Sequence, residues 1–118
     1  MSTNIKVTNM ELTRGINNYI DKRVLGISKF VKGGEMAVFV EVGKTTNHHK
    51  QGDIFRAEFN IEISGAKFYA FSEKEDLYTA IDDAKKEIIR QISSNKDRKQ
   101  TLFKRGASSI KNILKGFY

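Results

Sequence analysis

The feature that most constrains the fold is the strict alternation of apolar and polar residues over positions 55–63. Every second side chain there is apolar: Phe55, Ala57, Phe59, Ile61 and Ile63. A period of two places these side chains on one face of a strand, whose other face carries polar groups. Ser64-Gly65 then turns the chain into residues 67–71, which predicts a hairpin. A sheet with a single apolar face needs a second layer of structure to cover it.

Two segments have the helical periodicity that would supply this second layer. In the first, Thr13 is a good N-cap and Gly33-Gly34 is a good stop after about five turns. Its apolar positions are Leu12, Ile16, Tyr19, Ile20, Val24, Ile27, Phe30 and Val31. In the second, Ser72 and Glu75 have the spacing of a capping box, and the pattern ends near Ser93. Its apolar stripe contains Leu77, Ile81, Ala84, Ile88 and Ile92.

Shorter alternating runs at positions 5–7 and 38–42 complete the set of strands. The predicted order is β-α-β-β-β-α, an α+β fold with one mostly antiparallel four-stranded sheet and both helices packed on one of its faces. This order is similar to that of the double-stranded RNA-binding domain. Residues 44–53 contain no apolar side chain and are expected to form a mobile loop. We assign residues 1–99 to one domain and residues 100–118 to a basic C-terminal extension.

The composition argues against several classes of protein. The 118 residues include no cysteine, which excludes disulfides, a thiol nucleophile and cysteine-based metal sites. No apolar run approaches the roughly 18 residues that span a bilayer, and the first residues do not resemble a signal peptide, so we expect a cytoplasmic protein without a membrane partner. His48 and His49 are adjacent in the polar loop, which favours solvated side chains over a metal site. No nucleotide-binding loop motif occurs, and we predict no enzyme, no cofactor and no small-molecule substrate.

The charge is concentrated at the two ends of the chain. The formal net charge is +7 and the isoelectric point is about 9.7. Residues 1–34 carry +4 and the last 26 residues carry +6, whereas residues 35–72 carry −1 and residues 73–92 carry −2. A polyanion is the natural partner of such a chain, and a basic domain of this kind favours nucleic acid.

Helical geometry selects the basic residues that can reach such a partner. At about 100° per residue, Lys22, Lys29 and Lys32 point away from the predicted core, and Arg23 lies at its margin with its guanidinium directed toward the neighbouring helix. Acidic residues dilute the outer face of the second helix, but its end and the extension are basic. The candidate phosphate contacts are Lys22, Arg23, Lys29, Lys32, Lys86, Arg90, Lys96, Arg98, Lys99, Lys104, Arg105 and Lys111.

Three aromatic residues fall on the strand face opposite to the core. Phe39, Tyr69 and Phe71 could stack on bases, as aromatic side chains of single-strand-binding proteins do. The alternative interpretation is that they form cross-strand pairs, which suit aromatic residues in any sheet. A third possibility is that they form the interface of a dimer.

Several motifs together resemble a known family. They are Met10-Glu11-Leu12-Thr13, the spacing of Tyr19-Ile20, Arg23 and Lys29-Phe30, the run Glu75-Asp76-Leu77-Tyr78-Thr79-Ala80-Ile81-Asp82, and Arg90-Gln91. With these motifs the chain resembles the short form of the bacterial ribosome hibernation factors, the family of the hibernation promoting factor and the ribosome-associated inhibitor of translation. The resemblance covers residues 3–99, and residues 104–111 are similar to the segment that follows the second helix in the inhibitor branch.

The resemblance implies a partner and a mode of binding. The partner is the small ribosomal subunit, alone or in the 70S ribosome, and the helices lie against ribosomal RNA in the channel between head and body. There the protein would block the binding of messenger RNA and transfer RNA and would protect inactive ribosomes under stress. Arg23, Lys29 and Arg90 match basic positions of the family, whereas Glu87 stands where the family commonly has lysine. The long form carries a second, dimer-forming domain, which this chain is too short to hold, so we expect a monomer in the free state.

Two questions stay open at this point. Residues 101–118 are expected to be disordered in the free protein and to lie along the messenger RNA channel when bound. The alternative is a small helix docked on the open sheet. Two other functions also fit the sequence: a general RNA-binding or RNA-chaperone module, and a protein interaction module that dimerises through the open sheet face.

Overall fold

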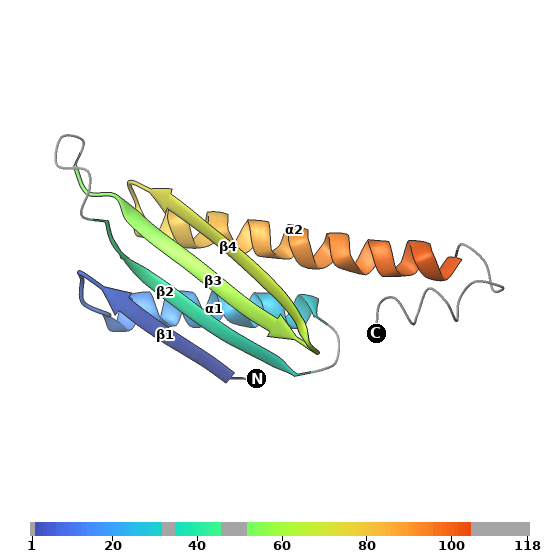
Figure 1. The fold of residues 1–118 in the computed structure, drawn as a ribbon. Coiled ribbons are helices and arrows are strands. Elements are labelled where there is room, and N and C mark those ends of the chain that lie inside the picture. The colour runs from blue at the N-terminus through green and yellow to red at the C-terminus, as the bar shows by residue number, and fades with distance from the viewer. Residues whose placement is uncertain (1, 32–34, 46–51, 105–118) are drawn as a thin grey trace.

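The computed structural model describes residues 2–31, 35–45 and 52–104, of which residues 97–104 are described as backbone only. The order of elements is the predicted β-α-β-β-β-α (Figure 1). The elements are β1 (Ser2–Thr8), α1 (Arg14–Phe30), β2 (Met36–Lys44), β3 (Phe55–Ile63), β4 (Ala66–Lys74) and α2 (Leu77–Lys104). The predicted hairpin is confirmed as β3 and β4. Ser64 and Gly65 turn the chain with φ angles of 48° and 86°, the left-handed pair that a tight two-residue hairpin requires.

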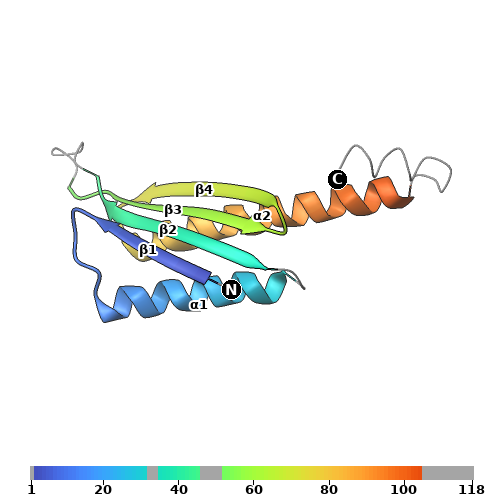
Figure 2. The same ribbon diagram turned by 60° about the horizontal axis from the view of Figure 1, so that its bottom comes forward.

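The four strands form one mixed sheet in the order β1-β2-β3-β4. The pairs β2–β3 and β3–β4 are antiparallel, and β1–β2 is parallel because α1 carries the chain back along the sheet before β2 begins. The predicted mostly antiparallel sheet is therefore confirmed. Both helices lie on the same side of the sheet, and α2 continues beyond its end (Figure 2).

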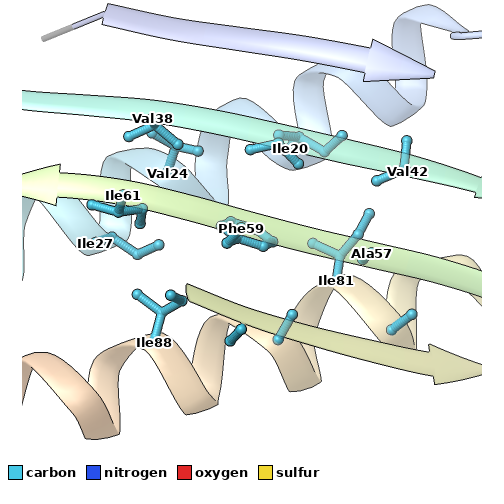
Figure 3. Close-up of a cluster of buried hydrophobic side chains, with 14 of the residues drawn as sticks. Ile20, Val24, Ile27, Val38, Val42, Ala57, Phe59, Ile61, Ile81 and Ile88 are labelled. Atoms are coloured by element: carbon cyan, nitrogen blue, oxygen red, sulfur yellow. The ribbon is translucent and has the colours of Figure 1, made fainter. Parts of the chain in front are cut away.

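The core lies between the helices and the apolar face of the sheet. Ile20, Val24 and Ile27 of α1 and Ile81 and Ile88 of α2 are at most 1% exposed. They pack with the buried side chains of the two central strands (Figure 3), which include Val38, Val42, Ala57, Phe59 and Ile61. These strand residues occupy alternate positions, as the sequence pattern predicts.

The start of α1 follows the prediction. The Oγ1 atom of Thr13 accepts a hydrogen bond of 3.1 Å from the backbone N–H of Ile16, which confirms Thr13 as the N-cap. Leu12, in contrast, is 38% exposed and is not part of the core. The expected stop at Gly33-Gly34 lies outside the described residues, as does most of the expected loop, at residues 46–51.

Both ends of α2 differ from the prediction. Ser72 and Glu75 do not form a capping box, because β4 keeps pairing with β3 as far as Lys74. Asp76 caps the helix instead: its Oδ2 atom accepts hydrogen bonds from the N–H and the hydroxyl of Thr79, at 2.9 and 2.8 Å. The predicted end near Ser93 is also wrong, since α2 runs to Lys104. Residues 101–104, which were expected to be disordered, are therefore helical, and residues 105–118 lie outside the described part of the chain. Residues 94–104 contain neither glycine nor proline, and the loss of an apolar stripe does not stop a solvated helix.

The contact between β1 and β2 generates a prediction about stability. A Cβ atom at Gly43 would lie 2.4 Å from the carbonyl oxygen of Thr8, its partner across the parallel strands. We expect Gly43→Ala to lower the free energy of unfolding by about 1–3 kcal/mol, since it forces the backbones of these strands apart. Urea denaturation measures the loss, and amide exchange should become faster in β1 before it does in β3.

The matched control is Gly15→Ala in the first turn of α1. There the nearest side-chain atom to an added Cβ is 3.8 Å away, so the change should be neutral or stabilising by at most about 1 kcal/mol. Equal stability of the Gly43→Ala variant and the unmodified protein would contradict the proposed close approach.

Candidate nucleic-acid interface

The two helices together form the most basic surface of the described molecule. We call this surface the helix side. The sequences of α1 and α2 contain eleven basic and five acidic residues. Lys22 and Lys29 on α1 and Lys86 and Arg90 on α2 are exposed, in agreement with their predicted outward positions. Lys96 is also exposed, and it lies on α2 beyond the predicted end of this helix. Arg98, Lys99 and Lys104 also lie on α2, whereas Lys32, Arg105 and Lys111 lie outside the described residues.

Arg23 connects the two helices. Its Nε atom lies 2.7 Å from Oδ1 of Asp82, and its Nη2 atom donates a 2.7 Å hydrogen bond to the hydroxyl of Tyr19. That hydroxyl donates in turn to Oδ2 of Asp82, also at 2.7 Å. The guanidinium is therefore directed toward the neighbouring helix as predicted. Because Asp82 balances its charge, Arg23 acts mainly by holding the two helices together and adds less to their basic surface than the lysines that form no ion pair among the described side chains.

This three-residue cluster shifts the pKa values of its members. Partial burial would raise the pKa of Asp82, but the hydrogen bonds from Arg23 and Tyr19 outweigh burial and lower it. The hydrogen bond to Asp82 is the main cause that raises the pKa of Arg23. Partial burial, followed by the hydrogen bond to Asp82, raises the pKa of Tyr19. The ion pair is thus the stable charge state of the cluster around neutral pH.

Arg90 has a local partner on its own helix. Its Nε and Nη2 atoms lie 2.8 and 2.6 Å from the two carboxylate oxygens of Glu87, a bidentate pair. Hydrogen bonds from Arg90 and then from Gln91 lower the pKa of Glu87 to about 2. Glu87, which stands where the resemblance led us to expect lysine, is the carboxylate that restrains Arg90. The Arg90 side chain is still 66% exposed, which leaves it accessible to a phosphate.

Two contacts of the helices were not predicted from the sequence. A Cβ atom at Gly26 would lie 3.0 Å from Nζ of Lys85, so this lysine crosses from α2 onto α1. Gly26, a glycine in the middle of a predicted helix, was the one feature of the sequence that could have indicated this close approach. The side-chain amide of Gln91 accepts from the N–H of Tyr69 and donates to its carbonyl oxygen, at 3.3 and 2.8 Å. Gln91 thereby occupies backbone groups on the outer edge of β4, which lowers the tendency of this edge to pair with another strand.

The opposite side of the sheet, which we call the open face, has a different chemistry. Phe39, Tyr69 and Phe71 are 52%, 44% and 49% exposed, which confirms their predicted orientation away from the core. The charged residues of the open face are four glutamates and three basic residues: Glu41, Glu58, Glu62, Glu73, Lys6, Arg56 and Lys67. Compared with the charges of the helix side, this balance of charges is unfavourable for the binding of a phosphate backbone.

Arg56 already engages the aromatic residues of the open face. Its guanidinium lies 3.9 Å from the ring centroid of Phe71, and it forms ion pairs with Glu58 at 2.7 Å and Glu73 at 3.7 Å. The rings of Tyr69 and Phe71 are 6.2 Å apart. The contacts of Arg56 with Phe71 and Glu73 cross from β3 to β4, whereas Tyr69 and Phe71 are neighbours on the same strand.

Within the described part of the chain, no group of three or more metal-ligating residues is close enough to hold an ion. The helices that the structure describes include none with the length and apolar character needed to cross a membrane. The fold and the charge distribution thus define a small basic α+β protein that presents a two-helix surface.

Comparison with known proteins identifies the family. The chain belongs to the family described as Sigma 54 modulation protein / S30EA ribosomal protein, whose model matches residues 3–100. It is 27% identical to the ribosome hibernation promoting factor of Pseudomonas putida over 92% of this chain and 99% of that protein. It is 23% identical to the protein of the same name from Escherichia coli K12, over 83% and 96%.

Solved structures share the fold. The N-terminal domain of Protein Y from Thermus thermophilus matches with a TM-score of 0.64 and 25% identity, over 77% of this chain and 91% of that one. A ribosomal subunit interface protein from Coxiella burnetii matches with a TM-score of 0.66 and 13% identity, over 82% and 99%. The predicted α+β architecture and the predicted family are therefore confirmed.

The cluster of Arg23, Asp82 and Tyr19 predicts a pH-dependent contribution to stability. Near neutral pH, Asp82→Asn should lower the free energy of unfolding by about 0.5–1 kcal/mol, as for other partly exposed ion pairs. A carboxylate with a lowered pKa stabilises the fold above its unfolded pKa, and the stabilisation is lost as pH falls through the folded pKa. The difference in the free energy of unfolding between the Asp82→Asn variant and the unmodified protein should therefore become smaller below about pH 4.

Chemical denaturation across this pH range measures the effect. Asp21→Asn, which removes a carboxylate from the exposed surface of α1, is the control and should change stability less. A destabilisation by Asp82→Asn that stays constant from pH 7 to pH 3 would show that the ion pair is not its source.

Proposed function

We propose that this protein is a ribosome hibernation factor that binds the small ribosomal subunit through its helix side. It binds at the decoding site, in the channel between head and body, where it blocks messenger RNA and transfer RNA. The carrying observation is the difference between the two surfaces. Among the residues whose side chains the structure describes, the helices have an excess of four basic residues and the open face has an excess of one acidic residue. The names of the relatives support the ribosome as the partner.

The mechanism is binding by charge and shape, with no bond made or broken. Exposed lysines on α1 and α2 contact phosphates and release counterions, which makes the affinity strongly dependent on salt. Arg23, Asp82 and Tyr19 hold the two helices in a fixed relation, so the lysines form one preorganised surface for folded RNA. The protein acts in the cytoplasm, where its ribosomal partner is, and protects inactive ribosomes there.

We further propose that residues 1–99 are the ribosome-binding domain and that residues 100–118 add phosphate contacts along the messenger RNA channel. The free protein is a monomer. A general RNA chaperone of the same fold would bind bulk duplex RNA as well as it binds subunits. The proposed factor instead saturates on small subunits, from which initiator transfer RNA or messenger RNA displaces it.

Two lysines on α1 test the helix side. In Lys22→Gln with Lys29→Gln, each lost phosphate contact should weaken binding to purified small subunits. The logarithm of the binding constant falls with the logarithm of the salt concentration, with a slope of about 0.8 for each phosphate contact. Loss of two such contacts therefore raises the Kd by about 20-fold at about 0.15 M salt. Co-sedimentation at several salt concentrations measures both the Kd and the slope, which should decrease by about 1.6.

The matched control is Lys6→Gln with Lys67→Gln on the open face, which removes the same charge. This variant should bind within about twofold of the unmodified protein, because its lysines lie on the face turned away from the RNA. A general attraction set by net charge would instead weaken both double variants equally. Equal weakening by the two double variants, or no weakening by either, would contradict binding through the helix side.

A further inference from the structure

A groove opens on the helix side where α1 ends and α2 continues. Its volume is about 490 Å³, and it is wide open to solvent. It is lined by Phe30, Lys86, Ile89, Arg90, Ser93 and Ser94. Phe30 is the last residue of α1, and the other five residues lie on successive turns of α2. The volume lies within the range of small-ligand sites, roughly 300–1,000 Å³.

The inner wall of this groove is apolar. Phe30 and Ile89 are half-buried and pack against the hydrophobic core, which fixes their positions. The ammonium group of Lys96 lies 5.3 Å from the centroid of the Phe30 ring. Lys96 therefore stands over the ring of Phe30, and a flat ligand that lies against Phe30 and Ile89 takes the place of the ammonium group on the ring and keeps it close by.

The rim of the groove is cationic and polar. Lys86 and Arg90 line it, Lys96 lies over Phe30, and Glu87 pairs with Arg90. The hydroxyl groups of Ser93 and Ser94 add hydrogen-bonding capacity. A ligand that matches this arrangement has a flat ring, a hydrogen-bonding edge and an anionic group. A nucleotide has all three.

We propose that this groove binds one unpaired nucleotide of the RNA that contacts the helix side. The base lies against Phe30 and Ile89, and its flanking phosphates contact Lys86 and Lys96. RNA-binding proteins commonly recognise unpaired bases in this way, by stacking and by contacts to the base edge. The inference rests on the proposed function and adds a defined subsite to it. Duplex RNA would leave this subsite empty, because its bases are paired and only its phosphates contact the helix side.

A photoreactive RNA tests the subsite directly. The probe is a short oligouridylate with a single 4-thiouridine, irradiated with the full-length protein, and the crosslinked peptides are mapped by mass spectrometry. We expect crosslinks at Phe30 or within residues 89–94. Crosslinks confined to Phe39, Tyr69 and Phe71 would overturn the proposal, because they would place the base on the open face.

Binding by variants gives the second measurement. Phe30→Leu keeps an apolar side chain but removes the ring, and it should raise the Kd for the same RNA by about fivefold or more, the lower bound for one stacked base. Phe39→Leu on the open face is the matched control and should leave the Kd unchanged. Ser94→Phe fills the groove from an exposed position without removing core packing, and it should weaken binding as Phe30→Leu does. Thermal unfolding establishes that each variant is folded.

The outcomes separate this inference from the proposed function. If Phe30→Leu and Ser94→Phe bind RNA and small subunits normally while the Lys22 and Lys29 variant does not, the subsite is wrong and the helix side stands. If none of these variants weakens binding to subunits, both proposals fail. A dimer in sedimentation that Ser94→Phe abolishes would identify a second copy of the chain as the occupant and would overturn the subsite.

Discussion

The rest of the structure depends on the burial of one face of the sheet. The buried apolar side chains of β2 and β3 occupy alternate positions, so they need a cover on a single side, and both helices supply it there. Burial of this kind is the dominant favourable term in folding. It also divides the molecule into two unlike surfaces, since the outer sides of two helices face one way and an uncovered sheet faces the other (Figure 2).

The charges then give these surfaces different roles. On the helix side, the charge of Arg23 is balanced by Asp82 and that of Arg90 by Glu87, whereas Lys22, Lys29, Lys86 and Lys96 form none of the ion pairs found among the described side chains. The arginines therefore combine positioning with charge, and the lysines provide the more available positive field. On the open face, Arg56 joins Glu58, Glu73 and Phe71 in a contact that stabilises the sheet. An anionic partner is favoured on the first surface and disfavoured on the second.

The sequence predicted the features that depend on local periodicity. The number and order of elements, the Thr13 cap, the hairpin and the outward direction of Phe39, Tyr69 and Phe71 all follow from spacing along the chain. The motifs in the two helices predicted the family, which the match over residues 3–100 confirms.

The sequence failed where a tertiary contact decides the outcome. The pairing of β4 with β3 keeps Ser72 in a strand, where its hydroxyl donates to Asp83 instead of capping a helix. Gln91 on the edge of β4 and Lys85 over Gly26 depend on partners distant in sequence, which no helical wheel identifies. The end of α2 was placed too early because an apolar stripe marks where a helix is buried and not where it ends.

The central claim is that a cationic helix side lies against ribosomal RNA. A cryo-electron microscopy map of the small subunit saturated with this protein tests it most directly. The account predicts density for α1 and α2 facing ribosomal RNA in the decoding channel, with the open face turned away from it. A map in which the sheet contacts the RNA and the helices face solvent, or in which the protein lies outside that channel, would contradict the account.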